Sequence, residues 1–148
     1  MTSDLQALYR DVIVDHHRHP RNFHTLEAGR HAEGFNPLCG DRLTVHVRVE
    51  NGAIQEVSFQ GLGCAIATAS ASLMTESVKG KTAAEADALF QRVQRMVTAS
   101  ADAPIDDLGA LSALAGVRRF PVRVKCATLA WHALGAATAA GDPVVTTE

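Results

Sequence analysis

Residues 43–63 read LTVHVRVENGAIQEVSFQGLG, and this stretch decides the fold class. Apolar and polar residues alternate from Leu43 to Val49, which is the period-two pattern of a strand with one buried face. Asn51-Gly52 follows, a pair that tolerates positive φ and gives the strongest short-range signal for a hairpin turn. A second strand is expected over about 53–60, and Gly61-Leu62-Gly63 predicts a sharp bend. The stretch therefore predicts an antiparallel hairpin.

Helical patterns lie on both sides of this hairpin. Apolar residues recur three and four positions apart, and Thr82 with Glu85 forms a capping-box signature. The stretch 21–38 has little periodicity and predicts an irregular loop, and 144–148 predicts a frayed tail. Because the helices flank the hairpin, the class is α+β. We expect helices over 5–19, 64–78, 82–98, 107–114 and 125–139.

Size and composition indicate one ordinary globular domain over residues 1–148. Hydrophobic residues make up 47% and charged residues 20% of the chain. The formal net charge is -2 and the pI is about 6.4, so we expect no general attraction to nucleic acid or anionic lipid. No apolar run reaches the roughly 20 residues that span a bilayer. Residues 1–4 lack the basic residues, followed by an apolar stretch, with which a signal peptide begins. The expected compartment is the cytosol.

The three cysteines lie where the expected structure changes. Cys39 lies in a loop that leads into the first strand, whereas Cys64 and Cys126 are expected to open helices. A thiol at a helix start has a lowered pKa because it faces unpaired N–H groups. Disulfides are rare in a reducing compartment, so these cysteines are metal ligands, reactive thiols or core residues.

Asp41 adds a carboxylate two residues after Cys39. If the chain is extended there, both side chains project to the same side. Three thiolates and one carboxylate make a tetrahedral set that suits Zn²⁺, and the negative charge of about -4 calls for nearby cations such as Arg123 and Lys125. Spacing alone leaves two alternatives open: three unlinked buried thiols, and a cysteine–histidine hydrolase.

Histidines and one tryptophan also attract a functional interpretation. We expect His16, His17 and His19 to form the solvated end of a helix, where cations interact well with the dipole. A docking surface for a partner enzyme is the functional alternative for them. Trp131 is expected in the core.

Three motif strings surround the cysteines: NPLCGD over 36–41, GLGCAI over 61–66 and KCATLAW over 125–131. In this order they resemble the IscU-like (NifU N-terminal-like) family, and within it the SufU branch. The resemblance covers nearly the whole chain. It implies an α+β fold with a small three-stranded antiparallel sheet packed against several helices. It also implies a role in iron–sulfur cluster biogenesis.

The SufU branch implies a particular chemistry. Its members resemble zinc-dependent sulfurtransferases, which accept persulfide sulfur from a pyridoxal-phosphate-dependent cysteine desulfurase (SufS-like) and pass it to downstream cluster-assembly proteins. Carried onto this chain, Cys39, Asp41, Cys64 and Cys126 are the metal ligands, and Cys39 is the catalytic sulfur acceptor. The Pro/Gly-flanked loop around Cys39 agrees, because it lets that thiol leave the metal and attack a persulfide.

Two other functions remain open. In the scaffold branch a histidine precedes the third cysteine and a transient iron–sulfur cluster assembles on the protein; here that position is Lys125, and a helical segment over about 80–120 fits the insertion of the SufU branch. Three cysteines and Asp41 can still ligate iron. The third possibility is a binding module with structural zinc only.

Overall fold

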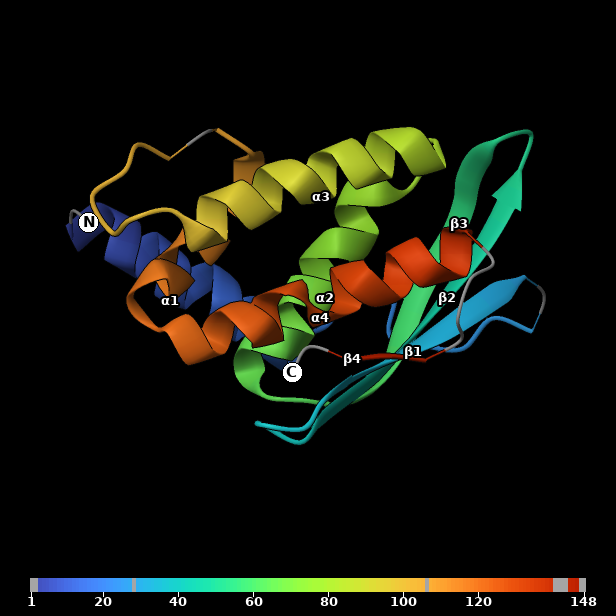
Figure 1. The fold of residues 1–148 in the computed structure, drawn as a ribbon, viewed down its shortest axis with the longest axis horizontal. Coiled ribbons are helices and arrows are strands. Elements are labelled where there is room, and N and C mark those ends of the chain that lie inside the picture. The colour runs from blue at the N-terminus through green and yellow to red at the C-terminus, as the bar shows by residue number, and fades with distance from the viewer. Residues whose placement is uncertain (1–2, 28, 106, 140–143, 147–148) are drawn as a thin grey trace.

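The computed structural model describes residues 3–27, 29–105, 107–139 and 144–146, and within them it contains a sheet with strand order β3-β2-β1-β4 (Figure 1). The strands are β1 (Arg30–Asn36), β2 (Asp41–Glu50), β3 (Ala53–Leu62) and β4 (Val144–Thr146). The helices are α1 (Ser3–Arg18), α2 (Ala65–Val78), α3 (Ala83–Thr98), the 3-10 helix η1 (Gly109–Arg119) and α4 (Pro121–Thr138).

The hairpin of β2 and β3 confirms the strand prediction. The two strands pair antiparallel, and both turn residues take positive φ, 54° at Asn51 and 78° at Gly52. Leu43, Val45 and Val47 are completely buried, so the alternating side chains of β2 form the inner face of the sheet. Asp41 lies at the start of the same buried row, which carries its carboxylate to the inner face at the end of the sheet.

β1 corrects the expectation of an irregular loop over 21–38. It pairs antiparallel with β2 along its whole length, from Arg30 to Asn36. Its buried residues are Ala32, Gly34 and Asn36, two small residues and one polar residue. The sequence of β1 therefore lacks the alternation of large apolar and polar residues that predicts a strand. Gly34 lies close to α4: a Cβ there would be 3.0 Å from the Leu129 side chain, which would have to shift.

β4 corrects the expectation of a frayed tail over 144–148. Val144–Thr146 pairs parallel with β1, opposite Glu33 to Phe35, while 147–148 lie outside the described residues. The free edge of β1 offers unpaired backbone groups, and a tail that returns along this edge satisfies them. Three residues are too few to show a pattern in the sequence.

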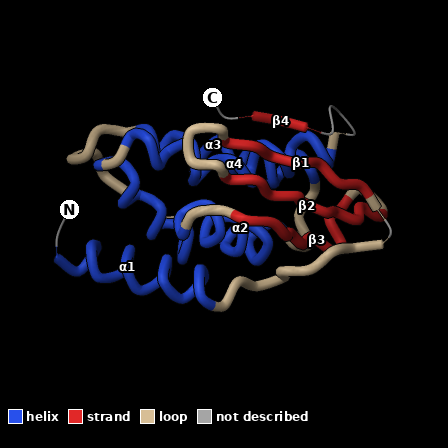
Figure 2. Tube along the Cα trace, turned by 90° about the horizontal axis from the view of Figure 1, so that it is seen from below, coloured by secondary structure: helices blue, strands red, loops and turns tan. Residues whose placement is uncertain are grey.

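The helices form two layers on the inner face of the sheet. α4 packs against β1 and β2, α2 packs against β3, and α1 and α3 lie farther out against α2 and α4 (Figure 2). The core between them includes Trp131, which is 1% exposed, as expected. These layers confirm the α+β class and the three antiparallel strands, to which the short parallel strand β4 is added.

The segment between α2 and α4 differs from its prediction in length and helix type. The capping box at Thr82 and Glu85 is present and starts α3. The short helix expected over 107–114 is a 3-10 helix that continues to Arg119. Arg118 anchors its end, because its guanidinium donates to the carbonyls of Met96 and Ala103 at 2.6 and 2.7 Å. That this segment is an insertion relative to the scaffold branch stays a prediction.

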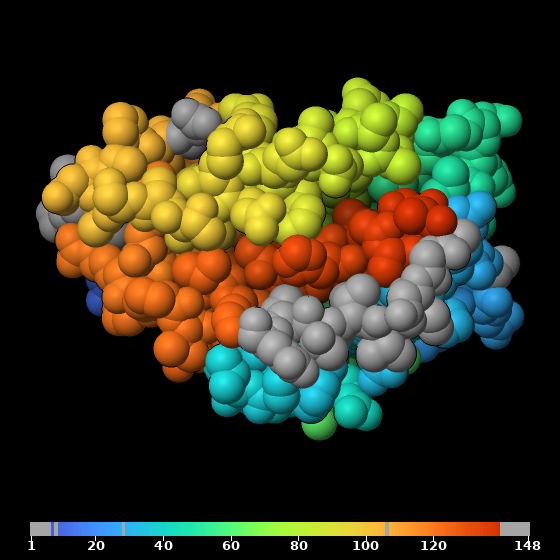
Figure 3. Space-filling model, in the orientation of Figure 1, coloured from blue at the N-terminus to red at the C-terminus, as the bar shows by residue number. Residues whose placement is uncertain are grey.

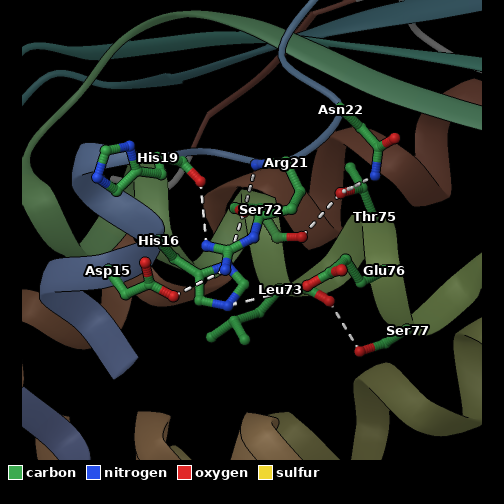
Figure 4. Close-up of polar contacts among 10 residues, drawn as sticks. All are labelled: Asp15, His16, His19, Arg21, Asn22, Ser72, Leu73, Thr75, Glu76 and Ser77. Atoms are coloured by element: carbon green, nitrogen blue, oxygen red, sulfur yellow. Dashed lines mark hydrogen bonds and ion pairs between the residues drawn. The ribbon is translucent and has the colours of Figure 1, made fainter. Parts of the chain in front are cut away.

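His16 corrects the expectation of a solvated helix end, although His17 and His19 are exposed. Its Nδ1 lies 2.7 Å from the hydroxyl of Ser72 in α2, and the same hydroxyl accepts the Arg21 amide at 2.9 Å (Figure 4). The direction of the bond between Nδ1 and the hydroxyl depends on the tautomer of His16, and Nε2 faces Glu76 at 3.8 Å. Burial and the nearby charge of Arg21 lower the pKa of His16.

Replacing His16 by Gln should flatten the dependence of stability on pH. Because the pKa of His16 is lowered on folding, its contribution is present above the unfolded value of 6.5 and is lost as pH falls through 6.5 toward the folded value. The wild-type Tm should therefore fall more than that of His16→Gln on this acidification in thermal melts. His17→Gln, an exposed control on the same helix, should follow the wild type. A fall in His16→Gln equal to that of the wild type would contradict this role.

Candidate metal centre

Three of the four predicted ligands converge at one end of the sheet. One ligand atom each from Cys39, Asp41 and Cys126 lies within 4.8 Å of the other two, and the Sγ atoms of Cys126 and Cys39 are 3.4 Å apart. Cys39 comes from the turn between β1 and β2, Asp41 begins β2, and Cys126 belongs to α4. Cys39 and Cys126, 87 positions apart in the sequence, thus lie side by side in the structure.

Cys64 completes the group from the N-terminus of α2. Its side chain caps this helix by accepting the amide of Ala67, and its own amide donates to Oδ1 of Asp41 at 2.8 Å. Its Sγ lies 3.9 Å from Oδ2 of Asp41 and forms a hydrogen bond with the thiol of Cys126. All four predicted side chains therefore lie around one point, with Cys64 slightly outside the tighter group of three.

The spacing and the donor set fit a zinc ion. Zn–S bonds of about 2.3 Å in a tetrahedron place two sulfurs about 3.7 Å apart, and a carboxylate oxygen slightly closer to each sulfur. The observed separations of 3.4 Å between the Cys126 and Cys39 sulfurs and 3.9 Å between Cys64 and Asp41 lie close to these values. Three thiols and one carboxylate can therefore hold such an ion after small side-chain adjustments.

Cys126 does not open its helix, which corrects the prediction for this residue. α4 begins at Pro121, because proline suits the first turn of a helix, and Cys126 lies in the second turn with no exposed surface. Its pKa is raised because it donates a hydrogen bond to Cys64 and because it is buried. The helix-start argument thus applies to Cys64 and not to Cys126.

Cys64 ionises more readily than Cys126 without a metal. The hydrogen bond from Cys126 lowers the pKa of Cys64 to about 6, with further help from the amides of Ala67 and Ile66. Burial and the charge of Asp41 act in the opposite direction. A thiolate at the N-terminus of α2 is therefore the natural first ligand for a cation.

Asn36 supports the site, and sequence reasoning did not assign it a role. It is completely buried, and its side-chain amide lies 3.4 Å from Oδ2 of Asp41 and 3.6 Å from the sulfur of Cys126. The side-chain carbonyl oxygen of Asn36 accepts a hydrogen bond from the backbone amide of Leu38 at 3.2 Å, and this bond shapes the turn that carries Cys39. A polar residue on the buried face at the end of a strand would have indicated a role for Asn36. This signal could not be used, because the sequence did not predict β1.

Arg123 supplies the positive charge expected beside the cysteines. The negative charge of Cys64 and a hydrogen bond to it raise the pKa of Arg123, and Cys126 and Cys39 contribute as well. Lys125 is half-buried in α4 next to Cys126. Arg123, one turn from Cys126 on α4, is therefore the cation that the structure places in contact with the thiols.

Access to the site is uneven. Cys39 is exposed, Cys64 is partly buried and Cys126 is buried. The turn that carries Cys39 projects from the end of the sheet (Figure 1), and this part of the chain, drawn in cyan, lies at the molecular surface in Figure 3. Gly40 takes a φ of 71°, and a Cβ added there would meet no other atom within 4 Å. A protein partner can thus reach Cys39 first.

A family model described as the NifU-like N terminal domain matches residues 8–140. The chain belongs to this family. The zinc-dependent sulfurtransferase SufU of Bacillus subtilis (strain 168) is 39% identical over 132 residues, which cover 89% of this chain and 90% of that protein. The iron–sulfur cluster assembly scaffold protein IscU of Streptococcus pyogenes serotype M1 is 40% identical and shares 89% of this chain and 83% of its own length.

Solved structures of the NifU-like family have the same fold. The crystal structure of a candidate iron–sulfur cluster assembly scaffold protein of the SUF system from Fervidobacterium islandicum AW-1 superposes with a TM-score of 0.80 at 31% identity. The match covers 90% of this chain and 98% of that one. These likenesses confirm the resemblance seen in the motifs. Among the described residues, the structure has no helix long and apolar enough to cross a membrane.

Replacing Asp41 by Ala should weaken metal binding at least tenfold. The change removes one predicted ligand and the acceptor that holds the Cys64 amide, so the start of α2 loses a contact and a bound ion would lose one as well. Zinc affinity is measured by competition with a chromophoric chelator, and alkylation of Cys39 should become faster. Asp102→Ala, an exposed carboxylate after α3, is the control. Unchanged zinc affinity and unchanged thiol reactivity would exclude Asp41 from the site.

Replacing Arg123 by Ala should weaken zinc binding about twofold to fivefold, the modest effect expected of an exposed charge pair. The same competition assay measures it at low and high salt, and salt should reduce the difference because it screens the pair. Arg119→Ala removes an exposed cation just before α4 and should behave as the wild type. Equal losses in the two variants would show a general charge effect rather than contact with the thiols.

Proposed function

We propose that this protein acts in iron–sulfur cluster biogenesis as a zinc-bound sulfur acceptor, which takes persulfide sulfur from a pyridoxal-phosphate-dependent cysteine desulfurase and passes it on. The observation that carries the proposal is the unequal placement of the thiols. Cys39 is exposed on a projecting turn, whereas Cys64 and Cys126 are held in helices beside Asp41. One thiol is therefore available for transfer while three side chains remain to hold an ion.

The transfer step is a thiolate exchange at sulfur. Cys39 attacks the terminal sulfur of the donor persulfide; the S–S bond of the donor breaks, and a new S–S bond forms on Cys39. The donor cysteine leaves as a thiolate, and the terminal sulfur keeps its proton. Such exchange needs an ionised attacking thiol and an accessible sulfur, and the exposed position of Cys39 provides the access.

Zinc held by Cys39, Asp41, Cys64 and Cys126 would supply a positive charge that keeps the thiols ionised at neutral pH. Arg123 contacts Cys64 from the exposed side, so its positive charge can stabilise the thiolate of Cys64. The SufU relative is named zinc-dependent, which supports this choice of ion. A reducing compartment such as the cytosol would keep the three cysteines free, as they are in the structure.

A scaffold for a transient iron–sulfur cluster is the second candidate. It is favoured by the similarity to the IscU protein of Streptococcus pyogenes, which is named a scaffold and matches over the same share of the chain. Against it stands Lys125, because this position offers no imidazole as a fourth ligand. Elemental analysis and the absorption spectrum of protein purified without oxygen separate the two: zinc with no cluster absorption supports the sulfur acceptor.

Replacing Cys39 by Ala should abolish sulfur acceptance while the fold is retained. The protein is incubated with the desulfurase and cysteine, and mass spectrometry locates added sulfur. Wild-type protein should carry it on Cys39 and should stimulate desulfurase turnover, whereas Cys39→Ala should do neither. Ser100→Ala, an exposed control after α3, should match the wild type. Normal stimulation by Cys39→Ala, or added sulfur only on other cysteines, would refute the role of Cys39.

A further inference from the structure

Histidines gather on the outer face of the sheet, away from the thiols. His46 alternates with Leu43, Val45 and Val47 along β2, so its ring lies on the face opposite to the core. His31 lies directly across from His46 on β1, and their ring centres are 5.8 Å apart. The cysteine centre uses none of these imidazoles.

Two buried polar atoms beside this pair lack a partner. Among the described residues, neither Nε2 of His46 nor the hydroxyl oxygen of Ser58 has a hydrogen-bond partner, and both atoms are buried. Ser58 faces His46 from β3 and is itself completely buried. Buried polar atoms are nearly always satisfied, so an orphaned imidazole nitrogen next to a second imidazole points to a bound group.

His24 brings a third imidazole from the segment before β1. Its Nδ1 lies 2.9 Å from the carbonyl oxygen of Thr25, which can only accept, so Nδ1 carries a proton and Nε2 carries the lone pair whenever the ring is neutral. This arrangement, one ring nitrogen held by a carbonyl and the other free, is typical of metal-binding histidines. Burial lowers the pKa of His46, and the charges of His31 and, to a smaller extent, His24 act in the same direction.

We propose that His31 and His46 bind a divalent transition metal ion that prefers imidazole, with His24 as a third ligand and Ser58 beside the site. Metal–nitrogen bonds of about 2.0–2.1 Å place two bound ring centres roughly 5 Å apart. The pair therefore needs only a small movement, which the exposed ring of His31 can make. The exposed ring of His24 must turn toward the pair to join it. Ions of this class include Zn²⁺, Co²⁺ and Ni²⁺.

This second site is independent of the sulfur-transfer function. Its ligands are neutral imidazoles, whereas those of the cysteine centre are thiolates and a carboxylate, so the two sites differ in their spectra and in the ions they favour. A water molecule between Ser58 and His46 would also satisfy the two orphaned atoms. Such a water would give no binding of added metal, and titration with metal therefore separates the two explanations.

The test is a titration of the purified, metal-free chain with Co²⁺ slightly above neutral pH. Total bound cobalt is measured by elemental analysis after equilibrium dialysis, and the thiolate-to-cobalt charge-transfer absorption reports the cysteine centre alone. The total cobalt bound per wild-type chain should exceed the amount reported by the charge-transfer absorption by one ion. His46→Ala and His31→Gln should each bind this additional ion at least tenfold more weakly, with the charge-transfer absorption unchanged.

His17→Ala is the matched control, because it removes an exposed imidazole from α1. It should retain the additional ion, and desulfurase stimulation by all of the histidine variants should equal that of the wild type. His31→Gln keeps the test valid if His46→Ala does not fold, since His31 is exposed. Equal cobalt content in the wild type and His31→Gln, or loss of the additional ion from His17→Ala, would overturn the proposal.

Discussion

The hydrogen bond from the Cys64 amide to Asp41 is the constraint on which the rest of the site depends. It joins the first residue of β2 to the start of α2 at 2.8 Å, and Asp41 is only 1% exposed. The end of β3 brings the two elements together, because it pairs with β2 and leads into α2. Gly61 takes a φ of 133°, and a Cβ there would lie 2.2 Å from the carbonyl oxygen of Arg42, so only glycine fits this close approach. Gly61 and Leu62 thus belong to β3 and not to the sharp bend that the sequence predicted.

Much of the fold around the site could be predicted, because short stretches of sequence specify the hairpin and the helix cap. The hairpin has a strict alternation and a turn pair that tolerates positive φ, and Thr82 with Glu85 specifies its own cap. The four predicted ligands were identified by residue type and by the motifs around them. Their convergence required the fold, which spacing alone left open and which the family resemblance supplied.

The elements that were missed depend on tertiary contacts. β1 buries Ala32, Gly34 and Asn36, which carry no hydrophobic signal; they are inward because α4 and the metal centre require small or polar residues there. β4 forms only because the edge of β1 is available. The length of η1 follows from the contacts of Arg118 with carbonyls of another segment. The local sequence of these segments does not indicate which distant residues they contact.

The centre combines groups that repel one another without a cation. The hydrogen bond from Cys126 lowers the pKa of Cys64, while the negative charge of Asp41 raises it. Cys64 therefore ionises while Cys126, whose pKa is raised, keeps its proton. A divalent ion held by these residues would change this balance, because its charge would favour the thiolate form of both Cys64 and Cys126. Ion affinity must then rise with pH, and ion binding must stabilise the junction of β2, α2 and α4. If Cys39 accepts sulfur as proposed, Asp41, Cys64 and Cys126 would still offer three ligands to an ion while Cys39 turns outward. The proposed site thus divides into a part held by β2, α2 and α4 and an exposed thiol on the projecting turn.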